Sequence, residues 1–476
     1  MEIIGRKEEI SKLKSYYGSG KPEFIALYGR RRVGKTYLVE QMFSEKFAFN
    51  VTGVIDGTNK DEMSVFFNAL KRIGYSGDIP KSWYDAFEVL KAQLEKNLRK
   101  NRRLLLFIDE LPCFDTKNSR FLKAFGDFWN DWCNKRPQVM LIVCGSATTW
   151  MIKNIVDSHG GLHNRMTHEL PLHPFTLTET EEYFKSNGIL WDRLAIIDMY
   201  SVLGGIPYYL SLIQNNESVS QTIDRLFFGS SSEMRGEYER LFKSLYKSPD
   251  PYMKIIELLC KTKAGLTRNE ISKFLDDKSN GHLSEYLDNL EKCDFIRLYH
   301  VKDRSGKYLK KSGGIYQVID FFTLFNYTFL KRPTTDPNFW SHQLNTPTIN
   351  NWQGLSFERI CLCHIENIKK ALGISAIAAE YFSWRSEESK PAAQIDLLIE
   401  RADRVVNVCE MKYCSGEYAL KKEEDLKIRN RIEAYKAESN TKCAVMPVLV
   451  TTYGLQKNTY SGNIWNVIVM DDLFAK

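Results

Sequence analysis

The sequence lacks any long hydrophobic run. No stretch of about 18 apolar residues occurs in the chain, so an ordinary membrane-spanning helix is excluded. The first residues, MEIIGRKEEISKLK, are charged and do not contain the apolar segment of a signal peptide. From these two absences we expect a cytoplasmic protein without a membrane partner.

Cysteine spacing of the kind that holds zinc is also missing. The sequence CLCH at residues 361–364 is not followed by a second Cys/His pair at finger spacing, so we expect no structural zinc. Several of the ten cysteines lie in or beside apolar runs, as reduced and buried thiols do: Cys113, Cys133, Cys144, Cys260 and Cys409.

An excess of acidic charge is absent too. The 66 Lys and Arg residues outnumber the 59 Asp and Glu residues, which gives a net charge of +7. This balance permits nucleic-acid binding without requiring it. Hydrophobic residues make up 43% and charged residues 26%, as in ordinary globular proteins. At 476 residues, the chain is long enough for about three domains.

A phosphate-binding loop stands out near the N-terminus. Residues Gly29–Thr36 follow the pattern G-x-x-x-x-G-K-T, between an apolar strand at Phe24–Tyr28 and a helix at Tyr37–Phe43. The glycines let backbone N–H groups turn toward phosphates, and the helix N-terminus adds positive potential. We expect Lys35 to reach the β- and γ-phosphates of ATP and Thr36 to ligate Mg²⁺. The predicted nucleotide-binding residues here are Gly29, Arg30, Arg31, Arg32, Val33, Gly34, Lys35, Thr36 and Tyr37.

A carboxylate pair ends the next strongly apolar strand. The run Leu104–Ile108 is typical of a central parallel strand and is followed by Asp109 and Glu110. Ligands of open α/β sheets bind at the carboxyl ends of such strands. We therefore expect Asp109 to hold Mg²⁺ and Glu110 to polarise the water that attacks ATP.

Two further polar residues allow two interpretations each. Ser146 follows the apolar strand VMLIVCG, where its hydroxyl can sense the γ-phosphate or cap the next helix. Arg165 can reach a phosphate as an arginine finger, in cis or from a neighbouring copy of a homo-oligomer. A solvent-facing arginine is the equally simple alternative.

A set of motifs in the first 215 residues resembles a known family. IIGRKEEISKL, GRRRVGKT, FIDELP, CGSAT, LPLHPFTLTE and GGIPYYL occur in this order. Together they resemble prokaryotic predicted ATPases of the AAA+/STAND group of P-loop NTPases, which often carry a DUF234-type C-terminal domain. The resemblance implies that Gly5 and Arg6 lie near adenine. It also implies that Pro207 packs on the base from a helical lid.

The middle of the chain predicts three short helices and a hairpin. PYMKIIELLC, TRNEISKFL and HLSEYLDNLEKCDFI have helical periodicity, and Thr267 with Glu270 fits a capping box. This order resembles a winged helix-turn-helix, with a hairpin turn at Ser305-Gly306. Its wing can contact DNA phosphates, or it can be a solvated hairpin on a protein-interaction module. The basic hairpin residues, set against Asp303, are Arg297, Lys302, Arg304, Lys307, Lys310 and Lys311.

The C-terminal third places charged groups inside two strands. Glu410 and Lys412 are two residues apart and so share a strand face, and Asp396 lies on the preceding strand. Facing strands can bring the two carboxylates to one Mg²⁺ ion, with Lys412 positioning a water or balancing charge on a phosphodiester. The alternative is a buried salt bridge, which is a costly way to hold a fold.

The spacing D-x13-E-x-K resembles the PD-(D/E)xK nuclease pattern, with Ile395 where the pattern names proline. The resemblance adds Glu358, on the preceding helix, as a metal ligand and Gln394 as a minor site residue. Such folds also persist as binding modules without cleavage.

These observations predict a multidomain α/β protein: a P-loop NTPase parallel sheet with a helical lid, a winged helix-turn-helix and a restriction-endonuclease-like domain. We expect an ATPase whose nucleotide state controls a DNA-acting C-terminal domain, with ATP and Mg²⁺ as cofactors. The alternative function is a signalling switch with a non-catalytic binding module. The predicted segments are residues 1–170 (ATPase core), 171–245 (lid), 246–330 (winged helix), 331–350 (linker) and 351–476 (nuclease-like domain).

Overall fold

The chain forms two compact units in a computed structural model. The N-terminal unit comprises residues 1–174 and 240–249, and the C-terminal unit comprises residues 175–239 and 250–476. The structure describes residues 3–96, 103–157, 162, 164–275, 280–300, 314–331, 334–386 and 393–475. Among these residues no helix combines the length and the apolar character needed to cross a membrane.

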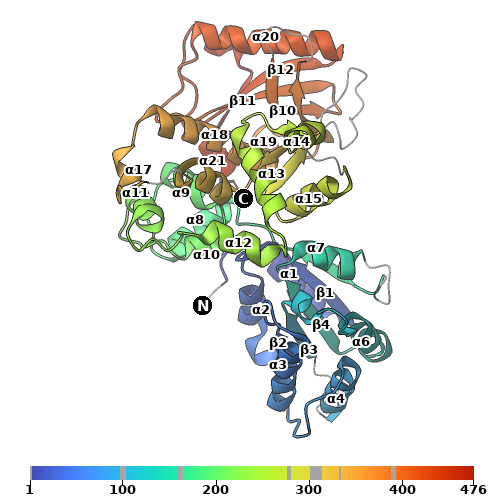
Figure 1. Cartoon of the computed structure of the whole chain (residues 1–476). Coiled ribbons are helices and arrows are strands. Elements are labelled where there is room, and N and C mark those ends of the chain that lie inside the picture. The colour runs from blue at the N-terminus through green and yellow to red at the C-terminus, as the bar shows by residue number, and fades with distance from the viewer. Residues whose placement is uncertain are drawn as a thin grey trace. The chain divides into compact units, whose positions relative to one another are not determined.

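A parallel five-stranded sheet, in the order β2-β3-β4-β1-β5, forms the centre of the N-terminal unit (Figure 1). Its strands are β1 (Glu23–Tyr28), β2 (Phe47–Thr52), β3 (Leu104–Asp109), β4 (Val139–Gly145) and β5 (His168–Pro171). Every residue of β1, β3 and β4 is buried, as the continuous apolar runs predicted. Strand β4 separates β1 from β3, so the ends of these three strands lie beside one another.

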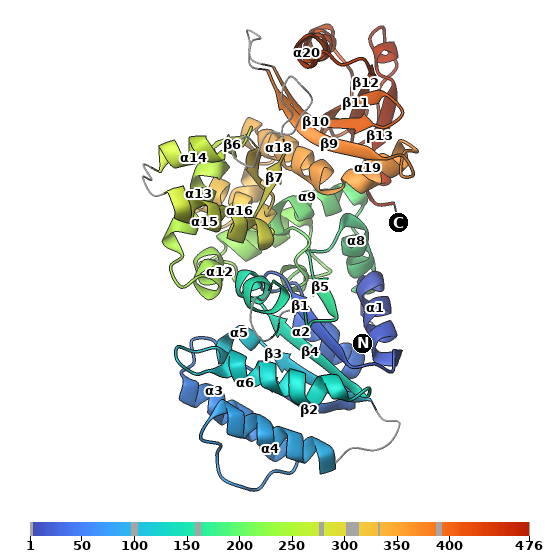
Figure 2. The ribbon, with the colours of Figure 1, turned by 90° about the vertical axis from the view of Figure 1, so that its right-hand side faces the viewer.

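Aromatic helices cover one face of this sheet (Figure 2). Phe66, Trp83 and Phe121 belong to one buried cluster with Phe24 and Leu106 of the strands. The helical segments of the unit are α1 (Lys7–Gly18), α2 (Lys35–Phe43), η1 (Ser44–Lys46), α3 (Asn59–Arg72), α4 (Trp83–Lys96), α5 (Leu111–Phe114), α6 (Phe121–Asp127), η2 (Phe128–Trp132), η3 (Cys133–Lys135), α7 (Thr148–Met151) and η4 (Ile152–Val156).

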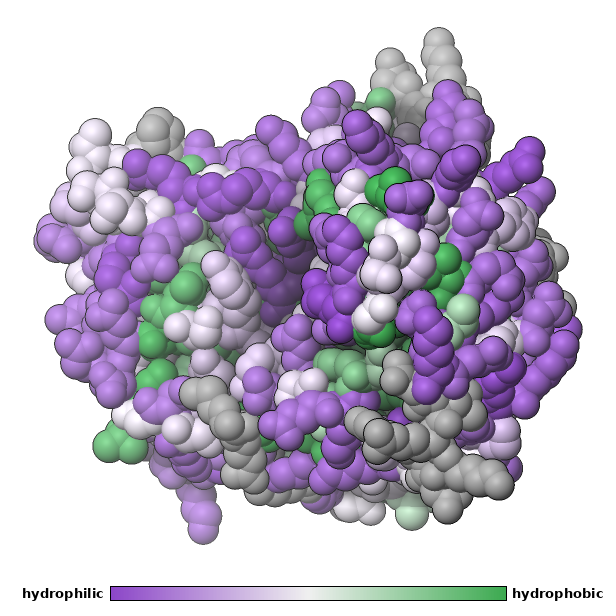
Figure 3. Space-filling model, turned by 90° about the horizontal axis from the view of Figure 1, so that it is seen from below, coloured by the Kyte–Doolittle hydropathy of each residue, from purple (hydrophilic) through white to green (hydrophobic). Residues whose placement is uncertain are grey.

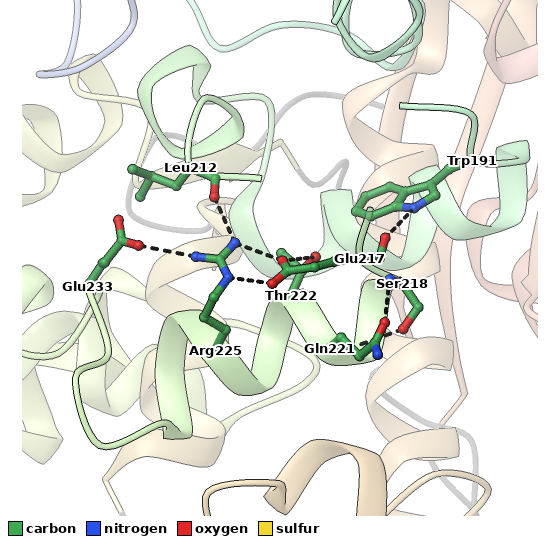
Figure 4. A network of polar contacts seen from close by, with 8 residues as sticks. All are labelled: Trp191, Leu212, Glu217, Ser218, Gln221, Thr222, Arg225 and Glu233. Carbon is green, nitrogen blue, oxygen red and sulfur yellow. Dashed lines mark hydrogen bonds and ion pairs between the residues drawn. The ribbon is translucent and has the colours of Figure 1, made fainter. Parts of the chain in front are cut away.

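Short helices make up residues 175–239 of the C-terminal unit. They are α8 (Leu177–Ser186), α9 (Arg193–Leu203), α10 (Pro207–Leu210), α11 (Val219–Ile223), η5 (Asp224–Phe228) and the start of α12 (Glu237–Leu245). A bidentate ion pair between Arg225 and Glu217, at 2.7 and 2.8 Å, ties η5 to the loop before α11 (Figure 4). Arg225 also donates to the Leu212 carbonyl and pairs with Glu233, so its guanidinium is committed to the fold.

Residues 250–330 contain the three predicted helices and a small antiparallel sheet. The helical segments are α13 (Asp250–Lys261), α14 (Arg268–Phe274), α15 (Asn280–Lys292), α16 (Phe321–Phe325) and η7 (Asn326–Leu330). The sheet has the order β6-β8-β7, with β6 (Leu266–Thr267), β7 (Ile296–Tyr299) and β8 (Ile315–Val318). The capping box of Thr267 and Glu270 is confirmed.

Most of the predicted basic hairpin lies outside the described residues. Ser305, Gly306 and most of its charged residues lie outside the described residues: Lys302, Asp303, Arg304, Lys307, Lys310 and Lys311. Arg297 is described and lies in β7, where its Nη1 donates to the Leu362 carbonyl at 2.9 Å. This arginine therefore has a structural partner within the unit.

The last part of the chain forms a mixed sheet in the order β13-β12-β11-β10-β9. Strands β9 (Ala379–Arg385), β10 (Gln394–Arg401) and β11 (Val405–Lys412) are antiparallel, and β11, β12 (Ala444–Thr451) and β13 (Asn466–Val469) are parallel. Its helical segments are α18 (Pro347–Cys363), α19 (Ile365–Ala371), α20 (Lys422–Ser439), η8 (Ser461–Asn463) and α21 (Met470–Leu473). The predicted order of helix, strands, helix and strands is present.

The segment expected to be a linker is partly folded. Residues Phe339–His342 form helix α17, and the Trp340 side chain is buried. The Trp340 N–H donates to Asp224 at 2.8 Å, which attaches α17 to η5. The polar sequence predicts a linker, but Phe339 packs on Phe228 and Ser341 also bonds to Asp224, so several contacts hold this segment on its neighbours.

The predicted lid helices pack within the same compact unit as the C-terminal sheet. His364, at the end of α18, accepts a hydrogen bond from the Leu177 N–H at 3.1 Å. Trp352 of α18 donates to Ser201 of α9 at 3.3 Å. Burial lowers the pKa of His364 to about 4, so it is neutral and can accept that bond.

Hydrophilic residues cover most of the face drawn in Figure 3, and hydrophobic residues there form small separate groups. This agrees with a charged fraction of 26%.

Candidate functional site

The phosphate-binding loop connects β1 to α2 in the N-terminal unit. Gly29 has φ of 151°, and a Cβ on this residue would lie 2.2 Å from the Leu172 carbonyl oxygen. Only glycine fits at this position, which explains the first glycine of the motif. Gly34 has φ of 90° and directly precedes α2, which places the loop at a helix N-terminus.

The two predicted ligand side chains of the loop have internal partners. Lys35 is buried, and its Nζ donates to the carbonyl oxygens of Gly29 and Arg30, both at 2.9 Å. Thr36 Oγ1 donates to Asp109 Oδ2 at 2.7 Å. The lysine thus bonds to the carbonyls of the loop, and the hydroxyl lies beside the carboxylate.

Asp109 ends β3 and is almost fully buried. Burial raises its pKa above the ordinary value, although the hydrogen bond from Thr36 acts in the opposite direction. Two hard oxygen donors 2.7 Å apart at the end of a buried strand fit the ligand preference of Mg²⁺.

Glu110 has both carboxylate oxygens engaged by one residue. Its Oε1 accepts from the Ser146 hydroxyl at 2.6 Å, and its Oε2 accepts from the Ser146 N–H at 3.1 Å. The strand order explains this contact, because β3 and β4 are neighbours and both residues follow their strand ends. Ser146 therefore orients Glu110, an interpretation that differs from both a γ-phosphate sensor and a simple helix cap.

The remaining predicted nucleotide residues are distributed over both units. Arg6, beside Gly5, donates to the Val33 carbonyl of the loop at 3.1 Å. Arg165 is exposed in a turn.

Pro207 begins α10 in the C-terminal unit, so its predicted contact with adenine stays a prediction. Of the other loop residues, Arg30 and Val33 are buried, Arg31 and Arg32 are half-buried, and Tyr37 is exposed.

The C-terminal carboxylates lie where β10 and β11 run side by side. Leu397 faces Cys409 in the antiparallel register, and we infer that one further step sets Asp396 opposite Glu410. A bulge interrupts the pairing of β10 with β9 between Ile395 and Leu398. Bulges of this kind re-aim side chains and are common beside active sites.

The two carboxylates have different partners, a neutral amide at Asp396 and two cations at Glu410. Asp396 Oδ1 accepts from Gln394 Nε2 at 2.8 Å. Glu410 Oε1 lies 2.8 Å from Lys412 Nζ, and Glu410 Oε2 lies 2.7 Å from Arg431 Nη1. Burial acts to lower the pKa of Lys412, but the Glu410 carboxylate keeps it above the ordinary value.

Glu358 of α18 belongs to the same electrostatic environment. Burial, and then the negative charge of Asp396, raise the pKa of Glu358 to about 7. Lys412 acts in the opposite direction. The charges of Asp396 and Lys412 thus act on Glu358, and its role as a metal ligand stays a prediction.

These carboxyl groups do not form a ready-made three-ligand site. Within the described part of the chain, no group of three or more His, Cys, Asp or Glu side chains is close enough to hold a metal ion. Both oxygens of Glu410 face cationic side chains, those of Lys412 and Arg431. The donor types fit Mg²⁺, but Glu410 must exchange a cationic side chain for the ion.

Four residues around this site were not predicted from the sequence. Arg431 lies on α20, and a polar cluster joins Asp198 of α9 to Gln353 and Tyr413, with the Tyr413 hydroxyl 2.8 Å from Asp198 Oδ1. Burial raises the pKa of Asp198 to about 6. The helical spacing of Ile428, Ile432 and Tyr435 does predict a buried face of α20, and Arg431 borders that face.

Residues 3–213 match the family model of an ATPase domain that is found predominantly in Archaea. This match supports ATP binding and hydrolysis by the part of the chain that contains Lys35, Asp109 and Glu110. The site described above therefore coincides with the region that the family defines.

Individual relatives cover different shares of the chain. The uncharacterised protein MJECL04 of Methanocaldococcus jannaschii is 26% identical over 366 residues, which are 75% of this chain and 76% of that protein. The ATP-binding protein MJ0423 of the same organism is 44% identical over 44 residues, which are 9% of this chain and 75% of that protein. Among solved structures, the Walker-type ATPase PABY2304 of Pyrococcus abyssi is 18% identical with a TM-score of 0.48, covering 68% of this chain and 96% of that one.

Proposed function

We propose that this protein is an ATP-hydrolysing switch whose nucleotide state controls a C-terminal domain that acts on nucleic acid. The observation that carries the first half is the contact of Thr36, on the helix that follows β1, with Asp109 at the end of β3, next to Glu110. The second half is supported by Asp396, Glu410 and Lys412 beside a β-bulge, and by a net charge of +7.

The residues of the N-terminal site divide the chemistry among them. Lys35 would leave the loop carbonyls for the β- and γ-phosphates, which are better partners for an ammonium group. Thr36 and Asp109 would hold Mg²⁺, which neutralises charge on the phosphates when bound. Glu110, oriented by Ser146, would accept the proton of the attacking water. Arg165 would supply a further positive charge, in cis or from another copy in a homo-oligomer.

The C-terminal site would use the same metal in a different way. Asp396, Glu410 and Glu358 would supply oxygen ligands once Glu410 releases a cationic side chain, and Lys412 would position a water or offset charge on the phosphodiester. The lid helices share a compact unit with this site, which gives nucleotide-dependent motion of the lid a physical route to it. DNA is the favoured substrate.

A second function is favoured by one specific observation. Glu410 holds two cationic side chains, and no three-ligand group is present among the described residues. A non-catalytic module that binds nucleic acid or protein would need no metal. The protein would then be a nucleotide-dependent regulatory switch rather than a nuclease.

Cleavage assays separate these two functions. We would incubate the full chain with single-stranded and duplex DNA and with RNA, in Mg²⁺ or Mn²⁺, with and without ATP. Metal-dependent cleavage that Asp396→Ala removes and Lys35→Ala makes ATP-independent would support the controlled nuclease. Binding without cleavage of any substrate would support the regulatory module. Absence of both would exclude nucleic acid as the partner.

A further inference from the structure

Arg431 places a second cation on a carboxylate that already has one. Its Nη1 lies 2.7 Å from Glu410 Oε2, while Lys412 Nζ lies 2.8 Å from Glu410 Oε1. Each oxygen of Glu410 therefore faces a different cationic side chain. A divalent ion can reach these oxygens only if one of the two cations leaves.

Packing of α20 on the sheet explains why this arginine reaches the site. Ile428 and Ile432 of α20 lie in one buried cluster with Val406 and Val408 of β11. Because alternate strand residues share a face, Glu410 continues that face beyond Val408. Arg431 precedes Ile432 on the helix, at the border of the buried face, where its long side chain extends to the strand end.

The attachment of the two cations indicates which one moves. Solvent screens both ion pairs of Glu410 to a similar degree, because the Arg431 side chain is 35% exposed and the Lys412 side chain is 32% exposed. Lys412 lies on the same strand face as Glu410, so β11 itself holds it beside the carboxylates. Arg431 comes from a separate helix and can swing away without any change in β11.

We propose that Arg431 is a phosphate-binding residue of the C-terminal site, which rests on Glu410 in the free protein and moves to a nucleic-acid phosphate when a divalent cation replaces it. The inference rests on the proposed function of this site. The guanidinium fork fits a phosphate as well as it fits a carboxylate. The exchange preserves charge balance, because Glu410 gains the metal cation and Arg431 gains the phosphate anion.

The test measures metal binding and nucleic-acid binding separately in the full chain. Arg431→Ala removes the competitor from Glu410, so Mn²⁺ affinity, measured without nucleotide by electron paramagnetic resonance, should rise about two- to tenfold. Affinity for a labelled duplex DNA in Ca²⁺ should fall, and the slope of log K against log salt should decrease by about one. Arg431→Lys keeps the charge and should retain most of the slope.

Lys436→Ala is the matched control. It removes one positive charge from the same helix, but Lys436 pairs with Glu433 at 3.5 Å and not with Glu410. If Arg431→Ala and Lys436→Ala behave alike in both assays, the role of Arg431 is wrong, even if Asp396→Ala abolishes Mn²⁺ binding and so supports the metal site. If both affinities fall in Arg431→Ala together with its melting temperature, the residue is structural and the inference is also wrong.

Failure of the proposed metal site gives a different result. If Asp396→Ala leaves Mn²⁺ affinity unchanged, the carboxylates do not hold a cation, and the exchange at Glu410 is overturned with them.

Discussion

Lys35 is the side chain on which nucleotide binding depends most directly. It is buried beneath the loop, and its ammonium group bonds the carbonyls of Gly29 and Arg30. Replacing it with alanine removes the charge that would follow the phosphates, so we expect Lys35→Ala to reduce ATP turnover at least about 100-fold. Turnover measured by phosphate release tests this, with Lys60→Ala, an exposed lysine of α3, as the control. Wild-type turnover in Lys35→Ala would contradict the assignment of the site.

A substitution at Glu110 should slow ATP hydrolysis without weakening ATP binding. Glu110→Gln keeps the size of the side chain and an oxygen that can accept a bond from Ser146, but the amide cannot take a proton from water. We expect the maximal rate to fall by about 100-fold or more while the Kd for ATP changes less than about threefold. Rapid-quench and equilibrium-binding measurements test the two parts. If the Kd for ATP rises by the same factor by which the maximal rate falls, Glu110 acts in ATP binding rather than in catalysis.

The stability of the protein should depend on pH because Glu62 of α3 is a buried carboxyl group. Burial raises its pKa to about 7. One oxygen accepts from the Val54 N–H, and the other has no hydrogen-bond partner within the part of the chain that the structure describes. The folded state therefore binds the proton more tightly than the unfolded chain, whose glutamates have a pKa near about 4.3. The free energy of unfolding consequently falls as pH rises from about 4.5 to 7.

Glu62→Gln removes this titration. Relative to wild type, the variant should gain about 1–3 kcal/mol of stability between pH 4.5 and pH 8, because only the wild type pays for a buried charge at the higher pH. Calorimetric melting of the full chain at both pH values measures the difference. An equal offset between the two proteins at both pH values would show that Glu62 does not titrate in this range.

Two glycines, one in the turn after a helix and one inside a helix, should respond in opposite ways to alanine. A Cβ on Gly205, which follows α9, would lie 1.9 Å from the Phe175 carbonyl oxygen, and the Phe175 N–H donates to Gly205. Gly205→Ala must push these backbones apart and should cost about 2–4 kcal/mol. Gly354, inside α18, has no atom within 4 Å of a Cβ, so Gly354→Ala should add about 0.5–1 kcal/mol through helix propensity. Melting temperatures that shift in the same direction would contradict this comparison.

The sequence predicts an element well when one uninterrupted apolar run or one short motif marks it. The loop before α2 and the carboxylates after β3 are local in sequence, and apolar runs mark the strands that carry them. Contacts between distant segments could not be predicted. Arg431 meets Glu410 only because α20 packs on β11, and Tyr413 meets Asp198 across 215 positions of the chain. Neither contact has a periodicity or a spacing that a sequence displays.

The predicted lid illustrates the same limit for larger segments. Its helices were expected from resemblance to form a part of the nucleotide site. Hydrogen bonds at His364, Trp352 and Tyr413 join these helices to α18 and to the residue after β11 within one compact unit, and their part in the nucleotide site stays a prediction. The sequence reveals that the helices exist, but side-chain contacts decide which neighbours they stabilise.

The whole molecule should obey reciprocal linkage if ATP controls the C-terminal domain. A factor by which bound ATP changes the affinity for nucleic acid must equal the factor by which nucleic acid changes the affinity for ATP. We expect this factor to be at least about five, because weaker coupling would not regulate a site. Glu110→Gln makes both equilibria measurable, since it should retain ATP without hydrolysing it.

The experiment compares two titrations of Glu110→Gln: duplex DNA with and without saturating ATP, and ATP with and without saturating DNA, both in Ca²⁺. Equal factors in the two titrations, lost when Lys35→Ala is added, would establish coupling through the nucleotide site. A factor of one in both would leave an ATPase and a C-terminal binding domain that act independently. The contacts between α9 and the carboxylate-bearing elements would then serve stability alone, and control by nucleotide would have to be abandoned.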